Sequence, residues 1–328
     1  MLTVTTVTSG SPPMTAVVKN TLYPSHLRHA LIIGFKLNTA LDPDKYFPSF
    51  LKHLRNVVTQ PIDMLQFLDD TPSLEIWEAL QGLKSISHLE MISGYTETCN
   101  IGPLDQVGSS WPLQSIVISS TCGEDIKTAH INTITSLTLE YCCGLSFSLA
   151  NRDTPSKSQK LTIIENDACD HFMKLQEETS LINNLIELKI QSTNDCDFAH
   201  QYKQQCFGKA LIRCHSLKLL DLTLYDSFED LSEEHYLIKL PAFFPPNLTV
   251  LRFRGPPALA NHLSVWYQCV SDPDWLPQLE SIQFSLDVHP RNEEIASSQE
   301  KATQFLKDLR SCRPSITILN DETSSRTN

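Results

Sequence analysis

Glycine is scarce in this sequence and is never clustered. The 328 residues include 10 glycines, and neither G-x-x-x-x-G-K nor G-x-G-x-x-G occurs. Those two patterns place backbone N–H groups around a phosphate, so a standard nucleotide site is disfavoured. The G-x-S-x-G turn that carries the nucleophile of many hydrolases is absent as well. We therefore expect a non-catalytic protein that holds no cofactor.

The sequence also lacks an excess of positive charge. Its 26 basic and 38 acidic side chains give a net charge of −12 at pH 7. Nucleic-acid binding depends largely on cationic neutralisation of phosphates, and anionic membrane surfaces attract basic segments. We therefore expect neither a nucleic acid nor a membrane as a partner.

Long apolar runs are missing too. No run approaches the roughly 20 residues that a membrane-spanning helix needs. The first residues, MLTVTTVTSGSPPMTAVVKN, have neither the charged start nor the apolar segment of a signal peptide. We expect a flexible leader over residues 1–24, a disordered tail over 321–328, and a cytoplasmic or nuclear protein.

The ten cysteines are irregularly spaced and include no C-x-x-C pair. Without a secretion signal, this spacing favours reduced thiols. Potential zinc ligands do gather between Cys169 and His215, and Cys196 and His200 have the spacing of one helical turn. We favour buried structural thiols over a metal site, because buried cysteine commonly behaves as a small hydrophobic residue. We therefore predict no bound metal.

One aliphatic pattern is abundant. In CHSLKLLDLTL (214–224), leucines fall at positions 217, 220 and 222, and the same spacing recurs along the chain. The seven copies are Ile86-Leu89-Met91, Leu113-Ile116-Ile118, Ile134-Leu137-Leu139, Leu185-Leu188-Ile190, Leu217-Leu220-Leu222, Leu248-Leu251-Phe253 and Leu279-Ile282-Phe284. Their middle residues step by 27, 21, 51, 32, 31 and 31 positions. The widest step is about two periods and contains a weaker copy, Leu161-Ile163. Other degraded copies are Ile316-Ile318 and RHALIIGF near the start.

This spacing predicts a stack of parallel strands. The last two aliphatic residues of each triplet lie on the same side of a strand, because side chains alternate, and the first caps the same core. One such unit cannot bury its apolar face alone, so neighbouring units must stack. We predict an α/β leucine-rich-repeat solenoid, with a curved parallel sheet, helices on the convex side and irregular repeats of about 21–34 residues. It would form a single domain over 25–320, degenerate up to about residue 85.

Four segments between the triplets predict helices. Segment 259–270 has a helical apolar face, and segment 292–311 begins with Asn292 as a cap. Residues 197–212 form the third, and the fourth begins at Thr71-Pro72.

The repeats resemble the leucine-rich-repeat region of fungal F-box-type proteins. CHSLKLLDL is similar to the family's cysteine-containing repeat, and FPPNLTVLRF (244–253) and DPDWLPQLESIQF (272–284) resemble its entry into each strand. The resemblance implies a substrate receptor of a cullin-type ubiquitin ligase, in which an F-box docks a Skp-type adaptor. Residues 1–50 do not contain the Leu-Pro-led helical pattern of an F-box, which is either absent from this chain or highly diverged.

The aliphatic residues of each triplet, which we call the anchors, face the core, and the residues that alternate with them on the strand point away from it. In the later copies they mix cationic, apolar and polar side chains: Lys189, Leu219, Asp221, Val250, Arg252, Arg254 and Gln283. Arginine beside apolar surface is typical of an interface centre, and guanidinium pairs well with carboxylates. We predict that this patch, on the concave face, binds an acidic or phosphorylated segment of a protein partner. The alternative is that the two arginines only balance Asp221 and Glu187.

These features together favour a non-catalytic protein–protein interaction scaffold. We interpret it as the substrate-recognition region of a protein related to F-box-type ubiquitin ligase receptors, with a Skp-type adaptor as a candidate partner. The alternative is a freestanding leucine-rich-repeat protein with a structural or signalling role and no connection to ubiquitin.

Overall fold

The computed structural model describes residues 14–23, 26–35, 48, 50–52, 54–56, 62–69, 72–93, 104–107, 110–120, 129–142, 155–193, 201–225, 231, 235–288 and 295–319. The chain divides into two compact units, Met1–Ser158 (unit 1) and Gln159–Asn328 (unit 2), where the sequence predicts one domain over 25–320.

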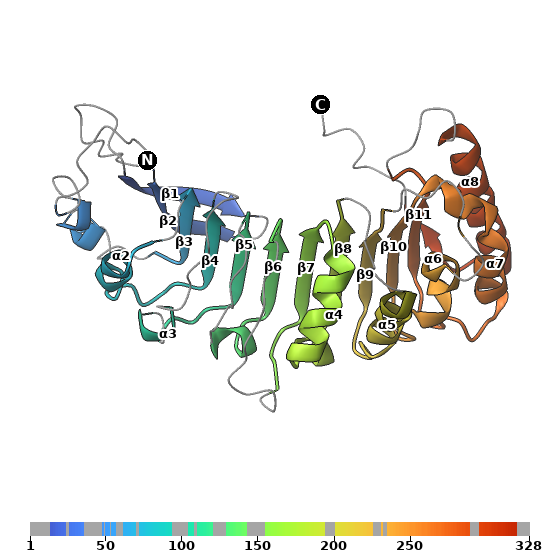
Figure 1. Cartoon of the computed structure of the whole chain (residues 1–328), viewed down its shortest axis with the longest axis horizontal. Helices are drawn as coiled ribbons and strands as arrows, with labels where there is room; N and C mark the ends of the chain where they lie inside the picture. The colour runs from blue at the N-terminus through green and yellow to red at the C-terminus, as the bar shows by residue number, and fades with distance from the viewer. Residues whose placement is uncertain are drawn as a thin grey trace. The chain divides into compact units, whose positions relative to one another are not determined.

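Unit 1 is built on a sheet whose described strands run side by side in chain order (Figure 1). They are β1 (Met14–Tyr23), β2 (His26–Phe35), β3 (Met64–Asp69), β4 (His88–Ser93), β5 (Ser115–Ser119) and β6 (Ser136–Glu140). Strands β2 to β6 are parallel, and β1 pairs antiparallel with β2. The connections include α2 (Leu74–Ala79), α3 (Leu104–Val107) and the 3-10 helix η1 (Ala129–Asn132).

Unit 2 contains a second set of parallel strands, again in chain order (Figure 1). They are β7 (Lys160–Glu165), β8 (Glu187–Ser192), β9 (Leu219–Thr223), β10 (Val250–Arg254), β11 (Ser281–Ser285) and β12 (Thr317–Ile318). The helices between them are α4 (Ala168–Glu178), α5 (Gln201–Ile212), α6 (Tyr236–Lys239), α7 (Leu263–Ser271) and α8 (Ile295–Cys312). The 3-10 helices η2 (Leu181–Asn184), η3 (Leu240–Phe243) and η4 (Pro257–Asn261) complete the connections.

The aliphatic triplets form the strands, as predicted. In unit 2, Leu188, Leu220, Leu251 and Ile282 occupy one register row across β8 to β11, and none of the four side chains is exposed. The middle residues of the unit 1 triplets form a corresponding row on β4, β5 and β6. All three degraded copies are strands as well, in β2, β7 and β12. The predicted α/β fold class, with stacked parallel strands and connecting helices, is therefore confirmed.

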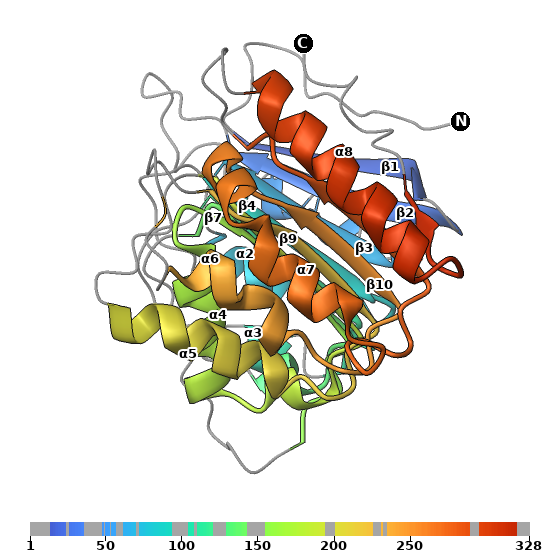
Figure 2. The ribbon, with the colours of Figure 1, turned by 90° about the vertical axis from the view of Figure 1, so that its right-hand side faces the viewer.

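The anchors face a core that is covered by the helices. Figure 2 shows α4 to α7 along one side of the unit 2 strands. At the centre of this core, the buried Trp266 ring of α7 lies 4.7 Å from Phe253, 5.2 Å from Phe284 and 6.3 Å from Phe305 between ring centroids. Its indole N–H donates to the Leu237 carbonyl at 3.1 Å, so the one polar atom of this side chain is satisfied.

A repeated set of hydrogen bonds fixes where each unit 2 strand begins. The backbone N–H groups of Thr249 and Val250 both donate to the Lys218 carbonyl, one strand earlier. The Asn247 side chain donates to the His215 carbonyl at 2.8 Å, and Gln278 of the next repeat donates to the Asn247 side-chain oxygen at 3.4 Å. The Asn or Gln that precedes the first aliphatic residue of these two repeats therefore ties adjacent turns together.

The structure differs from the sequence prediction in the N-terminal part. Strand β3 is a further parallel strand of the stack, within the region expected to be degenerate. Its Leu65 pairs in register with Leu31 of β2 and Leu89 of β4. Residues 1–24, expected as a flexible leader, contain β1. The distance along the sequence between aliphatic residues paired on neighbouring strands reaches 36 residues, from Ile282 to Ile318. This is slightly longer than the predicted repeat of about 21–34 residues.

Helix boundaries also shift. The segment predicted as one helix over 259–270 is divided between η4 and α7, which begins at Leu263. Helix α8 begins at Ile295, and the predicted cap Asn292 lies outside the described residues. The helix predicted to begin at Thr71-Pro72 is α2, which begins at Leu74 and has Ser73 at its N-cap position.

Candidate protein-binding face of unit 2

The predicted site residues come together on four adjacent parallel strands. Lys189, Asp221, Arg252 and Gln283 form one register row across β8 to β11. Leu219 and Val250 pair in the neighbouring row, and Arg254 lies in a third. These positions alternate with the buried anchors, so they lie on the face of the sheet opposite the helices. We call this surface the open face of unit 2.

The open face is accessible around the predicted residues. The exposed fraction of the Arg252 side chain is 44%, and that of Arg254 is 47%. Leu219 and Val250 are half-buried, and they pair with each other in the register row next to that of Arg252. Two aliphatic side chains therefore lie on the surface beside two guanidinium groups.

The central row alternates in charge. Asp221 on β9 lies between Lys189 on β8 and Arg252 on β10, and an Arg252 guanidinium nitrogen is 3.8 Å from the Asp221 carboxylate. Burial raises the pKa of the Asp221 carboxyl above its ordinary value, although the two neighbouring cations oppose this shift. The Asp221 carboxylate is thus poorly solvated.

Arg254 has a different environment from Arg252. Its Nε and Nη2 atoms donate to the two carboxylate oxygens of Asp287, at 2.6 and 3.1 Å. Glu187, considered from the sequence as a balancing charge for the arginines, instead forms an ion pair with Lys160 at 2.8 Å. Arg252 therefore lies near Asp221, as the alternative interpretation expects, whereas the carboxylate beside Arg254 is Asp287 and not Glu187.

Sequence reasoning missed Asp287. It follows the end of β11 by two residues and continues the outward alternation of Ser281, Gln283 and Ser285. Extending that alternation past the strand would have placed this carboxylate near Arg254.

The open face of unit 2 has a local charge that differs from that of the whole chain. Among the residues that the structure describes, its charged side chains are four cations and three carboxylates: Lys160, Lys189, Arg252, Arg254, Glu187, Asp221 and Asp287. This surface therefore carries one net positive charge, on a chain whose net charge is −12.

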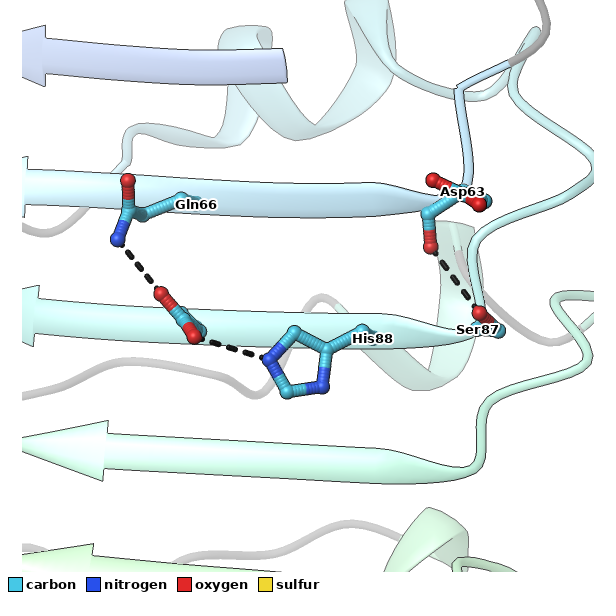
Figure 3. A network of polar contacts seen from close by, with 5 residues as sticks. Asp63, Gln66, Ser87 and His88 are labelled. Carbon is cyan, nitrogen blue, oxygen red and sulfur yellow. Dashed lines mark hydrogen bonds and ion pairs between the residues drawn. The ribbon is translucent and has the colours of Figure 1, made fainter. Parts of the chain in front are cut away.

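The corresponding face of unit 1 contains a buried polar network at β3 and β4 (Figure 3). Gln66 donates to one carboxylate oxygen of Glu90 at 2.6 Å, and the His88 ring nitrogen Nε2 lies 2.9 Å from the other oxygen. His88 is 7% exposed and Glu90 is 8% exposed. At the start of these strands, the Ser87 hydroxyl donates to the Asp63 carbonyl at 3.2 Å. These polar groups interact with one another inside unit 1, in contrast to the exposed arginines of unit 2.

The candidate zinc ligands are dispersed or buried in the part of the chain that can be described. No three His, Cys, Asp or Glu side chains among the described residues lie in a position to hold a metal ion. Burial raises the pKa of the Cys214 thiol to about 12, and its sulfur donates to the Ala210 carbonyl. At neutral pH a thiol with such a pKa is protonated and packs as a small buried group. Cys196 and His200 lie outside the described residues.

None of the helices that the structure describes combines the length and apolar composition needed to cross a bilayer.

Comparison with known proteins adds no family assignment. No protein-family model matches the chain, and no curated protein matches its sequence.

Proposed function

We propose that the protein is a non-catalytic protein–protein interaction scaffold that binds a partner on the open face of unit 2. The observation that carries this proposal is the register of β8 to β11, which brings arginine, lysine and aliphatic side chains onto one accessible surface. Parallel strands with helices on one side leave the other side of the sheet available for binding. Repeat proteins commonly use such extended surfaces for their partners.

The composition of this surface supports protein binding. Interface centres are enriched in arginine and in apolar contacts, and the residues with the largest energetic effects often lie where both occur. Leu219 and Val250 supply aliphatic area next to Arg252.

For the wider role, we propose a substrate-recognition region related to F-box-type ubiquitin ligase receptors. The resemblance of three repeats to that family supports this role: the repeats at 214–222, 244–253 and 272–284. In such a role the open face would hold the substrate, and a Skp-type adaptor would link the chain to a cullin.

Affinity purification of the tagged full chain tests both levels of the proposal. We expect co-purification of a Skp-type adaptor and a cullin, together with partners whose capture is lost in a Leu219→Glu/Val250→Glu variant. The matched control is Ile212→Glu, because Ile212 is an aliphatic residue on α5 that is 40% exposed on the helical side.

The outcomes separate the two levels. Partners that depend on Leu219 and Val250, without an adaptor or cullin, would favour the freestanding scaffold and contradict the ubiquitin role. Capture that is unchanged in the double variant but lost in the Ile212 variant would contradict the assignment of the binding face.

A further inference from the structure

The open face of unit 2 also indicates which chemistry its partner carries, and this inference rests on the proposed function. Two of its cations are already committed within the protein. Arg254 is held by both oxygens of Asp287, and Lys160 is paired with Glu187 at 2.8 Å. The other two cations among the described residues of this face, Lys189 and Arg252, share the single carboxylate of Asp221. The excess positive charge of the face is therefore concentrated in the central row.

The shared carboxylate does not engage Arg252 tightly. Its oxygen is 3.8 Å from the nearest guanidinium nitrogen, whereas the corresponding Arg254–Asp287 contact is 2.6 Å. A charge-assisted hydrogen bond between such groups is normally about 2.7–2.9 Å long. The Arg252 donors are thus only partly used, and 44% of this side chain is exposed.

We propose that the open face binds an extended acidic segment of another protein, with one carboxylate on Lys189, a second on Arg252, and an aliphatic side chain over Leu219 and Val250. The charge of the central row and the aliphatic pair beside it are complementary to such a segment. A basic segment or a purely polar segment would be less complementary to this surface.

The spacing of the strands sets the spacing of the partner's carboxylates. Lys189 and Arg252 are two strands apart, which places their backbones about 10 Å from each other. A polyproline-II segment repeats every three residues and rises about 3.1 Å per residue, so carboxylates three residues apart match this distance. The backbone N–H groups of that conformation have no internal partners, and one of them can donate to Asp221 between the two cations.

A phosphate group fits this surface less well than separate carboxylates. Phosphate is bound best by donors that converge on one point. Here Asp221 lies between the two available cations, and Arg254, the other nearby guanidinium, is held by Asp287. A phosphate dianion bound at the central row would lie next to the negatively charged Asp221 carboxylate, which would repel it.

Selection from a displayed library of random short peptides on the full-length chain tests this inference. We expect enrichment of peptides with acidic residues three positions apart and an aliphatic residue between them. The Lys189→Gln/Arg252→Gln variant should bind the enriched peptides about tenfold more weakly, because it removes two partly exposed ion pairs.

The control variant is Lys160→Gln/Lys209→Gln. It removes the same charge from unit 2, but from a cation already paired with Glu187 and from an exposed lysine of α5 on the helical side. We expect it to retain binding to within about twofold. An equal loss in both variants would show a general charge effect and overturn the assignment to Lys189 and Arg252. Displacement of the peptides by inorganic phosphate at equal concentration would overturn the preference for carboxylates.

The same selection separates failure of this inference from failure of the proposed function. Peptides without acidic residues that still depend on Leu219 and Val250 would overturn the acidic-segment proposal and leave the binding face in place. If no enriched peptide depends on any residue of the open face, both proposals are contradicted.

Discussion

Asp221 is a carboxylate that the fold holds in a poorly solvated position between two cations. Burial is the larger effect on it and raises its pKa above the ordinary 3.8, while Lys189 and Arg252 act in the opposite direction. The folded protein therefore binds this proton more tightly than the unfolded chain does. As the pH rises from 3.8 through the raised pKa, the contribution of Asp221 to the free energy of unfolding decreases.

We predict that Asp221→Asn is more stable than the wild type at neutral pH, because asparagine keeps the shape without the cost of a desolvated charge. The difference in unfolding free energy between the two proteins should shrink as the pH falls through that window. Urea unfolding at a series of pH values measures it. A variant that is less stable than the wild type at neutral pH would show that ion pairing, and not burial, dominates at this position.

Arg313 holds a strained turn at the entry to β11. It donates to the carbonyls of Trp275 and Leu276 at 2.7 and 2.8 Å, and its guanidinium carbon lies 6.0 Å from the centre of the Trp275 ring. Leu276 has φ = 45°, a left-handed conformation that costs a leucine on the order of 1 kcal/mol or more. The planar fork of arginine directs two N–H groups at neighbouring carbonyls in a fixed geometry that the lysine ammonium group lacks.

We predict that Arg313→Lys lowers the free energy of unfolding by about 1.5–3 kcal/mol, the usual value of a hydrogen bond to a charged group. Arg310→Lys is the control, because Arg310 is exposed on α8 and should change stability by less than about 0.5 kcal/mol. Chemical denaturation of both variants is the measurement. Similar effects at the two positions would contradict a specific role for the Arg313 contacts.

At the level of secondary-structure elements, the aliphatic spacing was sufficient to predict most strands. It placed the anchors of β4 to β6 and β8 to β11 correctly, because a residue must face the core at each position of the triplet. The rung at β3 has the same spacing, Ile62-Leu65-Phe67, so the sequence contains that signal as well. Strand β1 is different, because its antiparallel pairing with β2 depends on backbone hydrogen bonds that leave no triplet in the sequence.

Helices were harder to predict than strands. Helix α4 has the sequence ACDHFMKLQEE, whose cysteine, aspartate and histidine are weak helix formers. Its helical form depends on tertiary packing, in which Phe172 contacts Phe207 of α5 edge to face with 6.1 Å between ring centroids. At 257–261 the chain forms a 3-10 turn before α7, a distinction that an apolar pattern does not make.

The pairing of charges on the open face was also only partly predictable. Strand register can be derived from the anchors, and it brings Lys189, Asp221 and Arg252 together in one row. The contact between Arg254 and Asp287 depends on how the chain leaves β11, which periodicity does not determine. The site residues could therefore be placed from the sequence, but their internal partners could not.

Gly208 in α5 provides a test of element packing. A Cβ atom at this position would lie 2.6 Å from the Cγ atom of Phe243 in η3 and 3.1 Å from its Cβ atom. Because the Phe243 Cβ is also close, rotating the ring alone cannot relieve this contact.

We predict that Gly208→Ala destabilises the protein by about 1–2 kcal/mol, since overpacking outweighs the helix propensity that alanine adds. In a Phe243→Ala background the same substitution should be close to neutral, because the ring contacts are gone and only the Cβ contact at 3.1 Å opposes the gain in helix propensity. Thermal or urea unfolding of the four proteins measures this cycle. A stabilising effect of Gly208→Ala in the wild-type background would contradict the close approach of α5 and η3.

At the scale of the whole molecule, the main feature is the contrast between total and local charge. The chain has a net charge of −12, yet the described residues of the open face of unit 2 carry one net positive charge. For the acidic partner proposed above, this local positive charge would favour placement at the open face.

Hydroxyl-radical footprinting of the full chain, with and without a peptide selected by the open face, tests the binding-face proposal most directly. It reports the exposure of individual side chains in solution. We predict that Leu219 and Val250 become protected when the peptide binds, while Ile212 on the helical side of unit 2 reacts as before. Protection of Ile212 with no change at Leu219 and Val250 would contradict the account.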